Sequence, residues 1–220
     1  RLFILEDGAQ GVGGMIGNKR ACSFGDISTT SFFPAKPLGC YGDGGAVFTD
    51  NDEWAALADS YRVHGKGMFK YDNVRIGMNS RLDTLQAAIL KIKFKAFREY
   101  ELRDINKAAA LYTKLLAGRV KTPVTPEGYY SSWAQYTICL NSREERDALQ
   151  ACLKEQGIPS MVYYPTPMHG QTAYKALNAP TDCCPTAKRL CDTVLSLPVH
   201  PYITEEEIET VCSVILGFVR

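Results

Sequence analysis

The stretch LFILED, residues 2–7, decides the fold class of this chain. Four apolar residues followed by two carboxylates are typical of a short parallel strand that is buried on both faces and ends in polar residues. In open α/β sheets, ligands gather at the carboxyl ends of such strands. We therefore expect an α/β sheet domain with functional groups near Asp7.

The pattern continues along the first half of the chain. Short strands are predicted at residues 26–33 and 45–49, and a helix at 52–61. From Arg81 to about Leu116, apolar residues at helical spacing and several alanines predict one long helix, straight or kinked.

The second half is predicted to form a small α+β domain. Its expected elements are strands at 133–140 and 160–164 and helices at 142–157, 186–195 and 204–219. Two of these helices start with residues at capping-box spacing, Ser142 with Glu145 and Thr204 with Glu207. Gly157 stands where a helix C-cap is wanted.

Composition excludes several classes of protein. The 220 residues are 45% hydrophobic and 22% charged with a net charge of +1, as in an ordinary soluble protein. Basic runs are absent from the sequence, which argues against nucleic acid or an anionic membrane as the main partner. No apolar run approaches the ~20 residues of a membrane span. We expect a cytoplasmic protein with neither nucleic acid nor membrane as partner.

The eight cysteines form no CxxC pair and no Cys/His spacing suited to zinc. Several fall in apolar runs, so buried free thiols in a reducing cytosol are the interpretation we favour, with no metal site.

One lysine has an unusual setting. In SFFPAKPLGCYGDGG, residues 31–45, Lys36 lies between Pro34 and Pro37, which fix φ and remove two backbone donors. This segment is therefore predicted to be a shaped loop rather than a helix or a central strand. The glycines at 42–45 fit a tight turn and give only a weak phosphate-loop signal.

Three residues have both a chemical and an ordinary interpretation. Lys36 is either a solvated surface charge or an amine for covalent chemistry. Asp7 is either a cap or the partner of a cationic ligand atom, and Ser31 caps a turn or donates to a phosphate. Pyridoxal phosphate needs a lysine for its Schiff base and a carboxylate that keeps its pyridine nitrogen protonated, and Lys36 and Asp7 would supply that pair.

Six stretches resemble, in order, the successive motifs of the DegT/StrS family of nucleotide-sugar aminotransferases. These are pyridoxal-phosphate enzymes of the aspartate aminotransferase fold, called fold type I. The resemblance runs from Arg1 to about Glu207. Its stretches are ILEDGAQGVGG, GDISTTSFFPAKPLGCYGDGGAVFTDNDE, RVHGKG, GMNSRLDTLQAAIL, GIPSMVYYPTPMHGQTAY and LSLPVHPYITEEE.

The resemblance implies a role for each matching residue. Lys36 matches the Schiff-base lysine, Asp7 the partner of the pyridine nitrogen, and Gln10 a residue beside the cofactor ring and its 3-hydroxyl. Ser31 matches a phosphate ligand. Asn79 matches an asparagine that reaches the phosphate of the neighbouring subunit's cofactor, which implies a homodimer with shared active sites.

His64 and Arg81 match positions near the sugar-nucleotide pocket. The alternatives are a satisfied loop histidine for His64, a charge at a helix start for Arg81, and a helix cap for Asn79. Gly8 stands where the family's motif commonly has alanine, a change between small residues that we expect to leave the site intact.

The implied architecture is a partial large domain with a mixed or parallel sheet, residues 1–98, followed by the long connecting helix and a small carboxyl-terminal α+β domain, residues 99–220. The family's glycine/threonine phosphate-binding turn, the aromatic ring stacked on the cofactor and part of the sugar site normally lie ahead of LFILED. We therefore expect the chain to be truncated at its amino terminus.

The implied activity moves an amino group from an amino acid, with glutamate as the expected donor, to a keto group of a nucleotide-linked sugar. The motifs look most like the subgroup that acts on UDP-linked 3-keto uronic acids for O-antigen synthesis, with UDP-3-keto-N-acetylglucosaminuronate as substrate. The alternatives are an aminotransferase of dTDP- or UDP-4-keto-6-deoxy-sugars, a regulator derived from the family, and a fragment without catalysis. A dehydratase is disfavoured, because the resembling dehydratases have histidine in place of Lys36.

Overall fold

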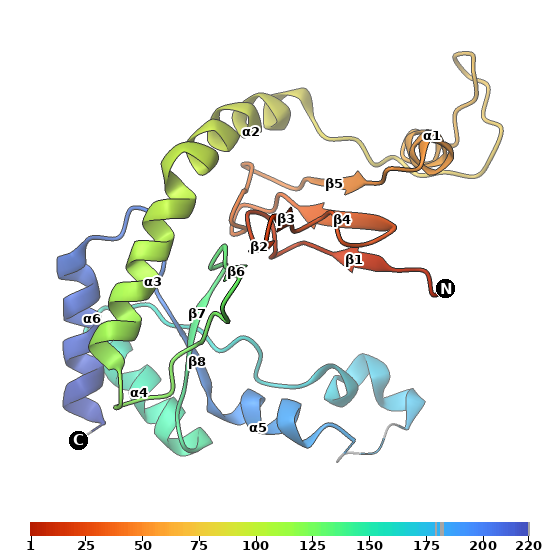
Figure 1. The fold of residues 1–220 in the computed structure, drawn as a ribbon. Helices are drawn as coiled ribbons and strands as arrows, with labels where there is room; N and C mark the ends of the chain where they lie inside the picture. Colours follow the sequence, from red (N-terminus) through yellow and green to blue (C-terminus); the bar gives the residue numbers. More distant parts are fainter. Residues whose placement is uncertain (179, 181–182, 220) are drawn as a thin grey trace. The chain divides into compact units, whose positions relative to one another are not determined.

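The computed structural model describes residues 1–178, 180 and 183–219. The chain divides into two compact units (Figure 1). The first comprises Arg1–Arg103 and Thr125–Ala134, and the second comprises Asp104–Val124 and Gln135–Arg220. The boundary expected between residues 98 and 99 refers to the large and small domains of the whole protein, and it stays a prediction.

The first unit is built on a three-stranded mixed sheet. Its central strand β4 (Ile27–Ser31) lies between β1 (Leu5–Asp7) and β5 (Gly45–Phe48), as Figure 1 shows. β1 runs parallel to β4, with Asp7 opposite Thr29, and β5 runs antiparallel to β4. The three strands lie within the segments predicted for them, and the mixed pairing agrees with the expected α/β class.

The predicted burial of the first strand is wrong for the described chain. Leu2 is 87% exposed and Leu5 is 65% exposed. Among the described residues β1 pairs only with β4, so it is an edge strand. Phe3 makes an edge contact with Trp54 of α1 (Asp52–Tyr61), with ring centroids 5.1 Å apart. The helix predicted at 52–61 is confirmed.

A second small sheet completes the first unit. Its strands β2 (Met15–Ile16), β3 (Lys19–Arg20) and β6 (Tyr129–Tyr130) pair antiparallel in the order β3-β2-β6. The Tyr130 hydroxyl donates to the Leu102 carbonyl at 2.9 Å. Strands of two residues are too short to give an alternating apolar pattern, which explains why the sequence did not predict them.

The predicted long helix is present with one irregular turn. It consists of α2 (Thr84–Ala96), a π-helical segment η1 (Phe97–Glu101) and α3 (Leu102–Leu116). The helical hydrogen bonding continues through η1, because the N–H of Leu102 donates to the carbonyl of Phe97. A π turn of this kind is usually a single insertion within an α-helix.

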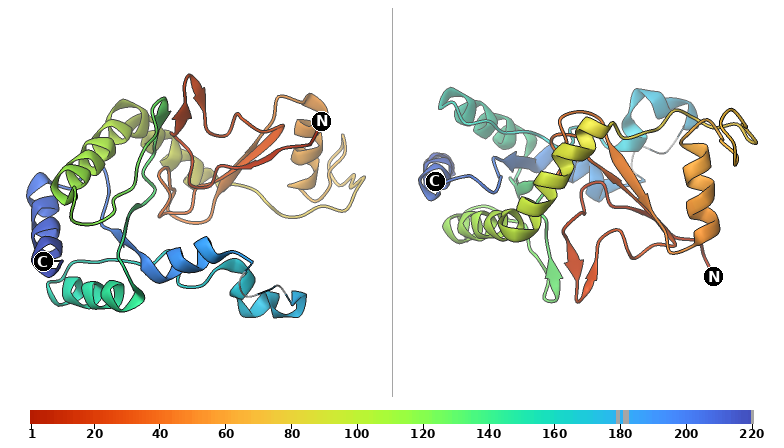
Figure 2. Two further views of the ribbon diagram at one scale, coloured as in Figure 1. Left: turned by 60° about the horizontal axis from the view of Figure 1, so that its bottom comes forward. Right: turned by 90° about the horizontal axis from the view of Figure 1, so that it is seen from above.

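The second unit packs helices around a two-stranded sheet. β7 (Tyr136–Cys139) pairs antiparallel with β8 (Val194–Leu197), and α4 (Arg143–Glu155) contacts β8, α5 (Pro185–Thr193) and α6 (Glu205–Phe218). The neighbouring positions of α4 and α6 can be followed in Figure 2. Two short 3₁₀ turns, η2 (Met168–Gly170) and η3 (Thr172–Leu177), precede α5.

Apolar side chains from α3, α4, α6 and both strands fill the core of this unit. Its fully buried members include Leu116, Ile138, Leu149, Leu153, Leu195, Ile208 and Ile215. Tyr112 of α3 is also fully buried, stacks on Tyr136 with ring centroids 5.0 Å apart, and donates its hydroxyl hydrogen to the Pro198 carbonyl at 2.9 Å. This tyrosine pair ties α3 to β7.

The capping predictions are confirmed with one difference. Thr204 and Glu207 form a reciprocal capping box at the start of α6. Ser142 accepts from the N–H of Glu145, as predicted, but the Glu145 carboxylate accepts from the N–H of Asn141 at 2.8 Å. The C-cap of α4 is Gln156, and Gly157 follows it with the left-handed φ of 72° that makes glycine suitable at a helix end.

Two other predictions for this unit need correction. Residues 160–164 form no extended strand, and only a single bridge joins Met161 to Ser196. The helix expected at 186–195 ends at Thr193, where the chain turns into β8. The prolines at 165 and 167 limit strand pairing just beyond Met161.

None of the eight cysteines forms a disulfide, and Cys40 and Cys212 are buried as expected. Burial raises the pKa of the Cys212 thiol to about 11. Cys183 and Cys184 are exposed, so the burial prediction is wrong for this pair, which lies in the irregular segment before α5. In the part of the chain that the structure describes, every helix is too short or too polar to cross a membrane.

Candidate functional site

The pairing of β1 with β4 brings two predicted site residues to one sheet edge. Asp7 ends β1 opposite Thr29, and Ser31 ends β4 two residues further along. Strands lie about 4.8 Å apart and rise about 3.3 Å per residue, which places the Cα atoms of Asp7 and Ser31 about 8 Å apart. Both residues therefore stand at the carboxyl edge of the same parallel pair, where ligands are bound in open α/β sheets.

Both side chains also shape the turn that follows them. One carboxylate oxygen of Asp7 accepts from the N–H of Ala9 at 3.0 Å, and the Ser31 hydroxyl accepts from the N–H of Phe33 at 3.2 Å. The capping roles left open by the sequence are thus present. Each side chain keeps bonding capacity for a ligand, a second carboxylate oxygen on Asp7 and a hydroxyl hydrogen on Ser31.

Lys36 lies in the closed loop that follows β4. The N–H of Lys36 donates to the Phe33 carbonyl at 2.9 Å, and the N–H of Cys40 donates to the Phe32 carbonyl at 2.7 Å. The loop is so tight that a Cβ at position 39 would lie 2.6 Å from the carbonyl oxygen of Pro34. Lys36 itself is half-buried. The shaped loop predicted from the prolines is confirmed.

A small apolar cluster holds the far end of this loop. Leu38 and Cys40 pack with Leu90 of α2 and with Phe97 of η1, and all four side chains are buried. The Gln86 side chain of α2 accepts from the N–H of Tyr41 at 2.8 Å. The loop that carries Lys36 is therefore anchored at its base and along α2, so the amine is presented from a rigid segment.

Glu6, which the sequence analysis did not single out, organises the chain next to Asp7. Its carboxylate accepts from the N–H groups of Cys22, Phe24 and Gly25 at 2.6, 2.7 and 3.1 Å and from the Ser28 hydroxyl at 3.1 Å. Burial raises the pKa of Glu6, but these four hydrogen bonds outweigh it and lower the pKa below its usual value. Glu6 thus fixes the segment that lies beside the carboxyl end of β1.

Gly8 and Cys22 fit against each other. A Cβ at position 8 would lie 2.3 Å from the Cys22 Sγ. Cys22 has a φ of 70°, a left-handed conformation that glycine adopts more easily than cysteine does. Burial, with the negative charge of Glu6 as a further cause, raises the pKa of the Cys22 thiol. The contact with Cys22 therefore requires glycine at position 8. The difference from the alanine of the family motif is more than an exchange of one small residue for another.

Gln10 is exposed in the turn that follows β1. Its backbone carbonyl accepts from the Ser132 hydroxyl at 3.1 Å. This bond fixes the backbone of the turn directly after the carboxyl end of β1.

The remaining predicted residues form a second group at the base of the loop between α1 and α2. A bridge pairs Val63 with Asn79, and the N–H of His64 donates to the Met78 carbonyl at 2.9 Å. The Arg81 Nε donates to the Asn79 Oδ1 at 2.9 Å. These contacts bring His64, Asn79 and Arg81 together.

The capping alternative for Asn79 is wrong. The N-cap of α2 is Asp83, and Asn79 accepts instead from Arg81, three residues ahead of the helix. In the described chain no carboxylate forms an ion pair with Arg81, whose side chain is exposed. Arg81 is thus an exposed cation that is held by Asn79 through its Nε.

A carboxylate and a hydroxyl at the carboxyl edge of a sheet, with a lysine in the loop that follows, form a candidate cofactor site of an α/β protein. The chain belongs to the DegT/DnrJ/EryC1/StrS aminotransferase family, whose sequence model matches residues 1–216. Its sheet and helices belong to fold type I, as the resemblance implied.

Three relatives illustrate the match. The chain is 41% identical over 96% of its length to the UDP-2-acetamido-2-deoxy-3-oxo-D-glucuronate aminotransferase of Pseudomonas aeruginosa. It is 42% identical over its whole length to a protein of Geobacillus stearothermophilus named pleiotropic regulatory protein. A crystal structure of a DegT DnrJ EryC1 StrS aminotransferase from Brucella abortus superposes with a TM-score of 0.93 over 99% of the chain at 46% identity.

The chain spans only part of each of these relatives. It covers 56% of the Pseudomonas protein, 59% of the Geobacillus protein and 57% of the Brucella chain.

Proposed function

We propose that the protein carrying this chain is a pyridoxal-phosphate-dependent aminotransferase. It would move an amino group from an amino acid, with glutamate as the expected donor, to the 3-keto group of a UDP-linked uronic acid. The observation that carries the proposal is the position of Lys36, held in a closed loop directly after the strand whose carboxyl edge bears Ser31 and, on the next strand, Asp7.

The chemistry of these side chains fits pyridoxal phosphate. Lys36 would hold the cofactor covalently, Asp7 would face its ring nitrogen, Ser31 would donate to its phosphate and Gln10 would lie by its ring hydroxyl. When bound, this cofactor supplies an electron sink for the bond that breaks at the amino carbon.

The residues of this chain then have separate tasks. The Asp7 carboxylate favours the protonated ring nitrogen, because an opposite charge at close range stabilises both charged forms. Once the amino donor has displaced Lys36 from the cofactor, its free Nζ would act as general base and acid. It would take the proton from the donor's amino carbon and, in the second half of the reaction, give a proton to the sugar carbon that gains the amino group. The anchored loop keeps Nζ in place during both transfers.

Arg81 supports a uronic acid as the substrate. A guanidinium grips a carboxylate through two parallel hydrogen bonds, and the terminal nitrogens of Arg81 are exposed beside Asn79. We assign His64 to the same sugar-nucleotide region and Asn79 to the cofactor phosphate of the partner subunit, which makes the working unit a homodimer. Reduced cysteines favour a cytoplasmic location, and a role in O-antigen synthesis would follow from this substrate.

Borohydride reduction of the full-length protein with pyridoxal phosphate, followed by peptide mapping, tests the role of Lys36. We expect the label on Lys36, none in Lys36→Ala, and wild-type labelling in Lys66→Ala, because Lys66 pairs with Asp59 at 2.9 Å. Label on another lysine of the wild-type protein contradicts the proposal.

Two keto sugars test the substrate. Charged hydrogen bonds contribute about 1.5–3 kcal/mol, so Arg81→Ala should lower kcat/KM for the UDP-3-keto uronic acid about 10- to 150-fold. The matching UDP-3-keto-N-acetylglucosamine lacks the carboxylate, so its kcat/KM should fall much less in Arg81→Ala. Equal losses would mean that Arg81 does not bind a carboxylate, and preferred turnover of a 4-keto-6-deoxy-sugar would favour that alternative substrate class.

A regulator is the second candidate, favoured by the similarity to the pleiotropic regulatory protein. Such a protein would show the Lys36 label without transferring an amino group from glutamate to any of these keto sugars.

A further inference from the structure

A cluster of metal-ligating side chains lies in the second unit, away in sequence from every residue of the proposed cofactor site. His169 of η2 lies beside Cys183 and Cys184, and one potential ligand atom from each of the three lies within 4.8 Å of the other two. His169 is half-buried and both cysteines are exposed. Among the described residues this is the one such group of histidine, cysteine or acidic side chains.

The spacing of the two sulfurs fits a tetrahedral ion. The Sγ atoms of Cys183 and Cys184 are 3.8 Å apart, which is too far for a disulfide. Two thiolates bound to zinc at about 2.3 Å in tetrahedral geometry lie about 3.8 Å apart, and a sulfur and an imidazole nitrogen about 3.6 Å apart. The observed sulfur pair already has this spacing, and the imidazole nitrogen of His169 must approach each sulfur by at most about 1.2 Å.

Both sides of the cluster are fixed by the fold. The 3₁₀ turn that carries His169 is closed by the N–H of Gly170, which donates to the Pro167 carbonyl at 2.9 Å. Cys184 is the N-cap residue of α5, and its carbonyl accepts from the N–H of Lys188 at 3.1 Å. His169 and Cys184 therefore come from defined backbone positions.

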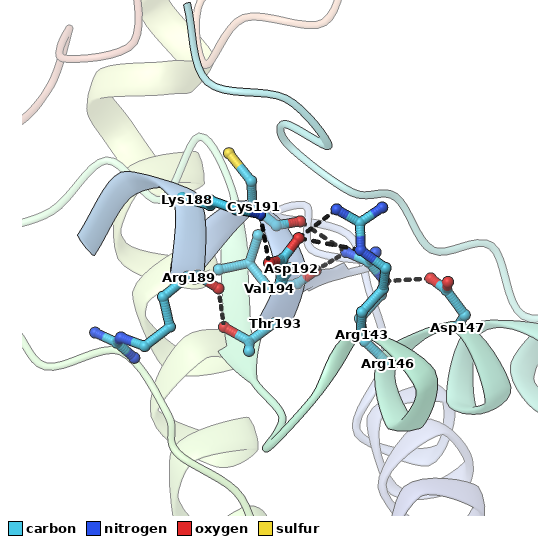
Figure 3. A network of polar contacts seen from close by, with 9 residues as sticks. All are labelled: Arg143, Arg146, Asp147, Lys188, Arg189, Cys191, Asp192, Thr193 and Val194. Carbon is cyan, nitrogen blue, oxygen red and sulfur yellow. Dashed lines mark hydrogen bonds and ion pairs between the residues drawn. The ribbon is translucent and has the colours of Figure 1, made fainter. Parts of the chain in front are cut away.

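Helix α5 is in turn fastened to α4, as Figure 3 shows. The Arg146 guanidinium donates to the carbonyls of Cys191 and Val194 at 3.2 and 3.3 Å, and the Arg143 Nε donates to the Asp192 carboxylate at 3.0 Å. A pocket of about 230 Å³ is lined by His169 and its neighbours Pro165, Thr166, Pro167 and Gly170, together with Arg143, Lys188, Cys191 and Asp192. His169 thus borders the same pocket as the middle and the carboxyl end of α5.

We propose that His169, Cys183 and Cys184 bind one Zn²⁺ ion, with the fourth coordination position open to solvent. Two thiolates and one imidazole form a ligand set that zinc accepts in proteins, and the fourth position then takes water. Negative charge on the thiolates is favoured at the amino end of α5. Carboxylate-preferring ions such as Mg²⁺ and Ca²⁺ do not suit these ligands. The bound ion would join η2 to α5.

Metal titration of the full-length, reduced protein tests the site. We expect one Zn²⁺ per chain to bind in competition with a chromophoric chelator. Co²⁺ in its place should give thiolate-to-cobalt charge transfer and the intense visible bands of tetrahedral cobalt. Cys183→Ser/Cys184→Ser should abolish this binding, and His169→Gln should weaken it at least ~100-fold, more than the loss of an outer contact does.

Cys152→Ser is the matched control, because Cys152 lies on α4 of the same unit outside the cluster, and it should bind as wild type. Circular dichroism checks that the variants stay folded. Absence of one-to-one binding, a weak octahedral cobalt spectrum, or wild-type affinity in either cluster variant would each overturn the proposal.

Discussion

The contact between Gly8 and Cys22 predicts that Gly8→Ala destabilises the protein although alanine is common at this position of the family motif. The new methyl group would lie 2.3 Å from the Cys22 Sγ. Favourable carbon contacts begin near 3.5 Å, so the sulfur must move by about 1.2 Å. The Cys22 backbone cannot follow easily, because its N–H is held by Glu6 at 2.6 Å. Overpacking of this size costs about 1–3 kcal/mol.

The second half of the test changes the neighbour. Cys22→Gly should be close to neutral, because relief of the left-handed φ gains about 1 kcal/mol, while the lost side chain and the added backbone freedom cost a similar amount. In that background the atom nearest to the Gly8→Ala methyl is the Thr29 carbonyl oxygen, at 3.1 Å. We expect the penalty of Gly8→Ala to fall by about 1–2 kcal/mol.

Urea unfolding of the full-length protein and its single and double variants measures this coupling. Gly217→Ala is the control for glycine removal, because its Cβ would meet nothing within 4 Å in α6, and it should be stabilising. Additive effects of the two changes, within about 0.5 kcal/mol, would refute the reasoning.

Four further predictions concern the site and the second unit. Glu6→Gln should lower stability by about 1.5–3 kcal/mol at neutral pH. Because folding lowers the pKa of Glu6, this difference should begin to shrink as the pH falls through about 4.5 and should vanish only below the lowered pKa of the folded state; a pH-independent loss in urea titrations would contradict it. Asp7→Asn should still bind the cofactor spectroscopically but lose most transamination, and near-normal turnover would make Asp7 structural. Mixing Lys36→Ala with Asn79→Ala subunits should restore activity, because a heterodimer has one site free of both changes if Asn79 acts across the interface. No recovery, once subunit exchange is confirmed, would place Asn79 in its own chain's site. Thr204→Ala should lower the unfolding free energy by about 1 kcal/mol by removing a cap, and an unchanged urea midpoint would speak against that.

Local sequence signals predicted the elements whose causes are local. The helix at 52–61 and the capping box of Thr204 with Glu207 are set by residues within a few positions of one another. The two-residue strands β2, β3 and β6 depend on pairing partners that are far away in the sequence, and no local pattern marks them. The expected strand at 160–164 fails for a similar reason, because only Met161 finds a partner.

The arrangement of the candidate site residues could not be predicted from the sequence. The prolines around Lys36 predict a rigid loop. The closeness of Asp7 and Ser31, in contrast, depends on β1 pairing with β4 in one register. The role of Glu6 depends on four hydrogen-bond donors from residues 22–28. The sequence LFILED alone therefore does not indicate which of its two carboxylates accepts these structural hydrogen bonds. The position of His169 beside Cys183 likewise follows from tertiary structure, since the sequence shows no zinc spacing between them.

The long helix should tolerate the loss of one residue at the π turn Phe97–Glu101 better than within α2 or α3. Each residue of an α-helix turns the chain by about 100°, so a one-residue deletion within α2 or α3 would rotate one apolar face away from its core and expose residues such as Tyr112. A deletion inside the π turn instead converts it to an ordinary α turn and leaves both faces in phase. Insertions and deletions among natural sequences should therefore concentrate in this turn.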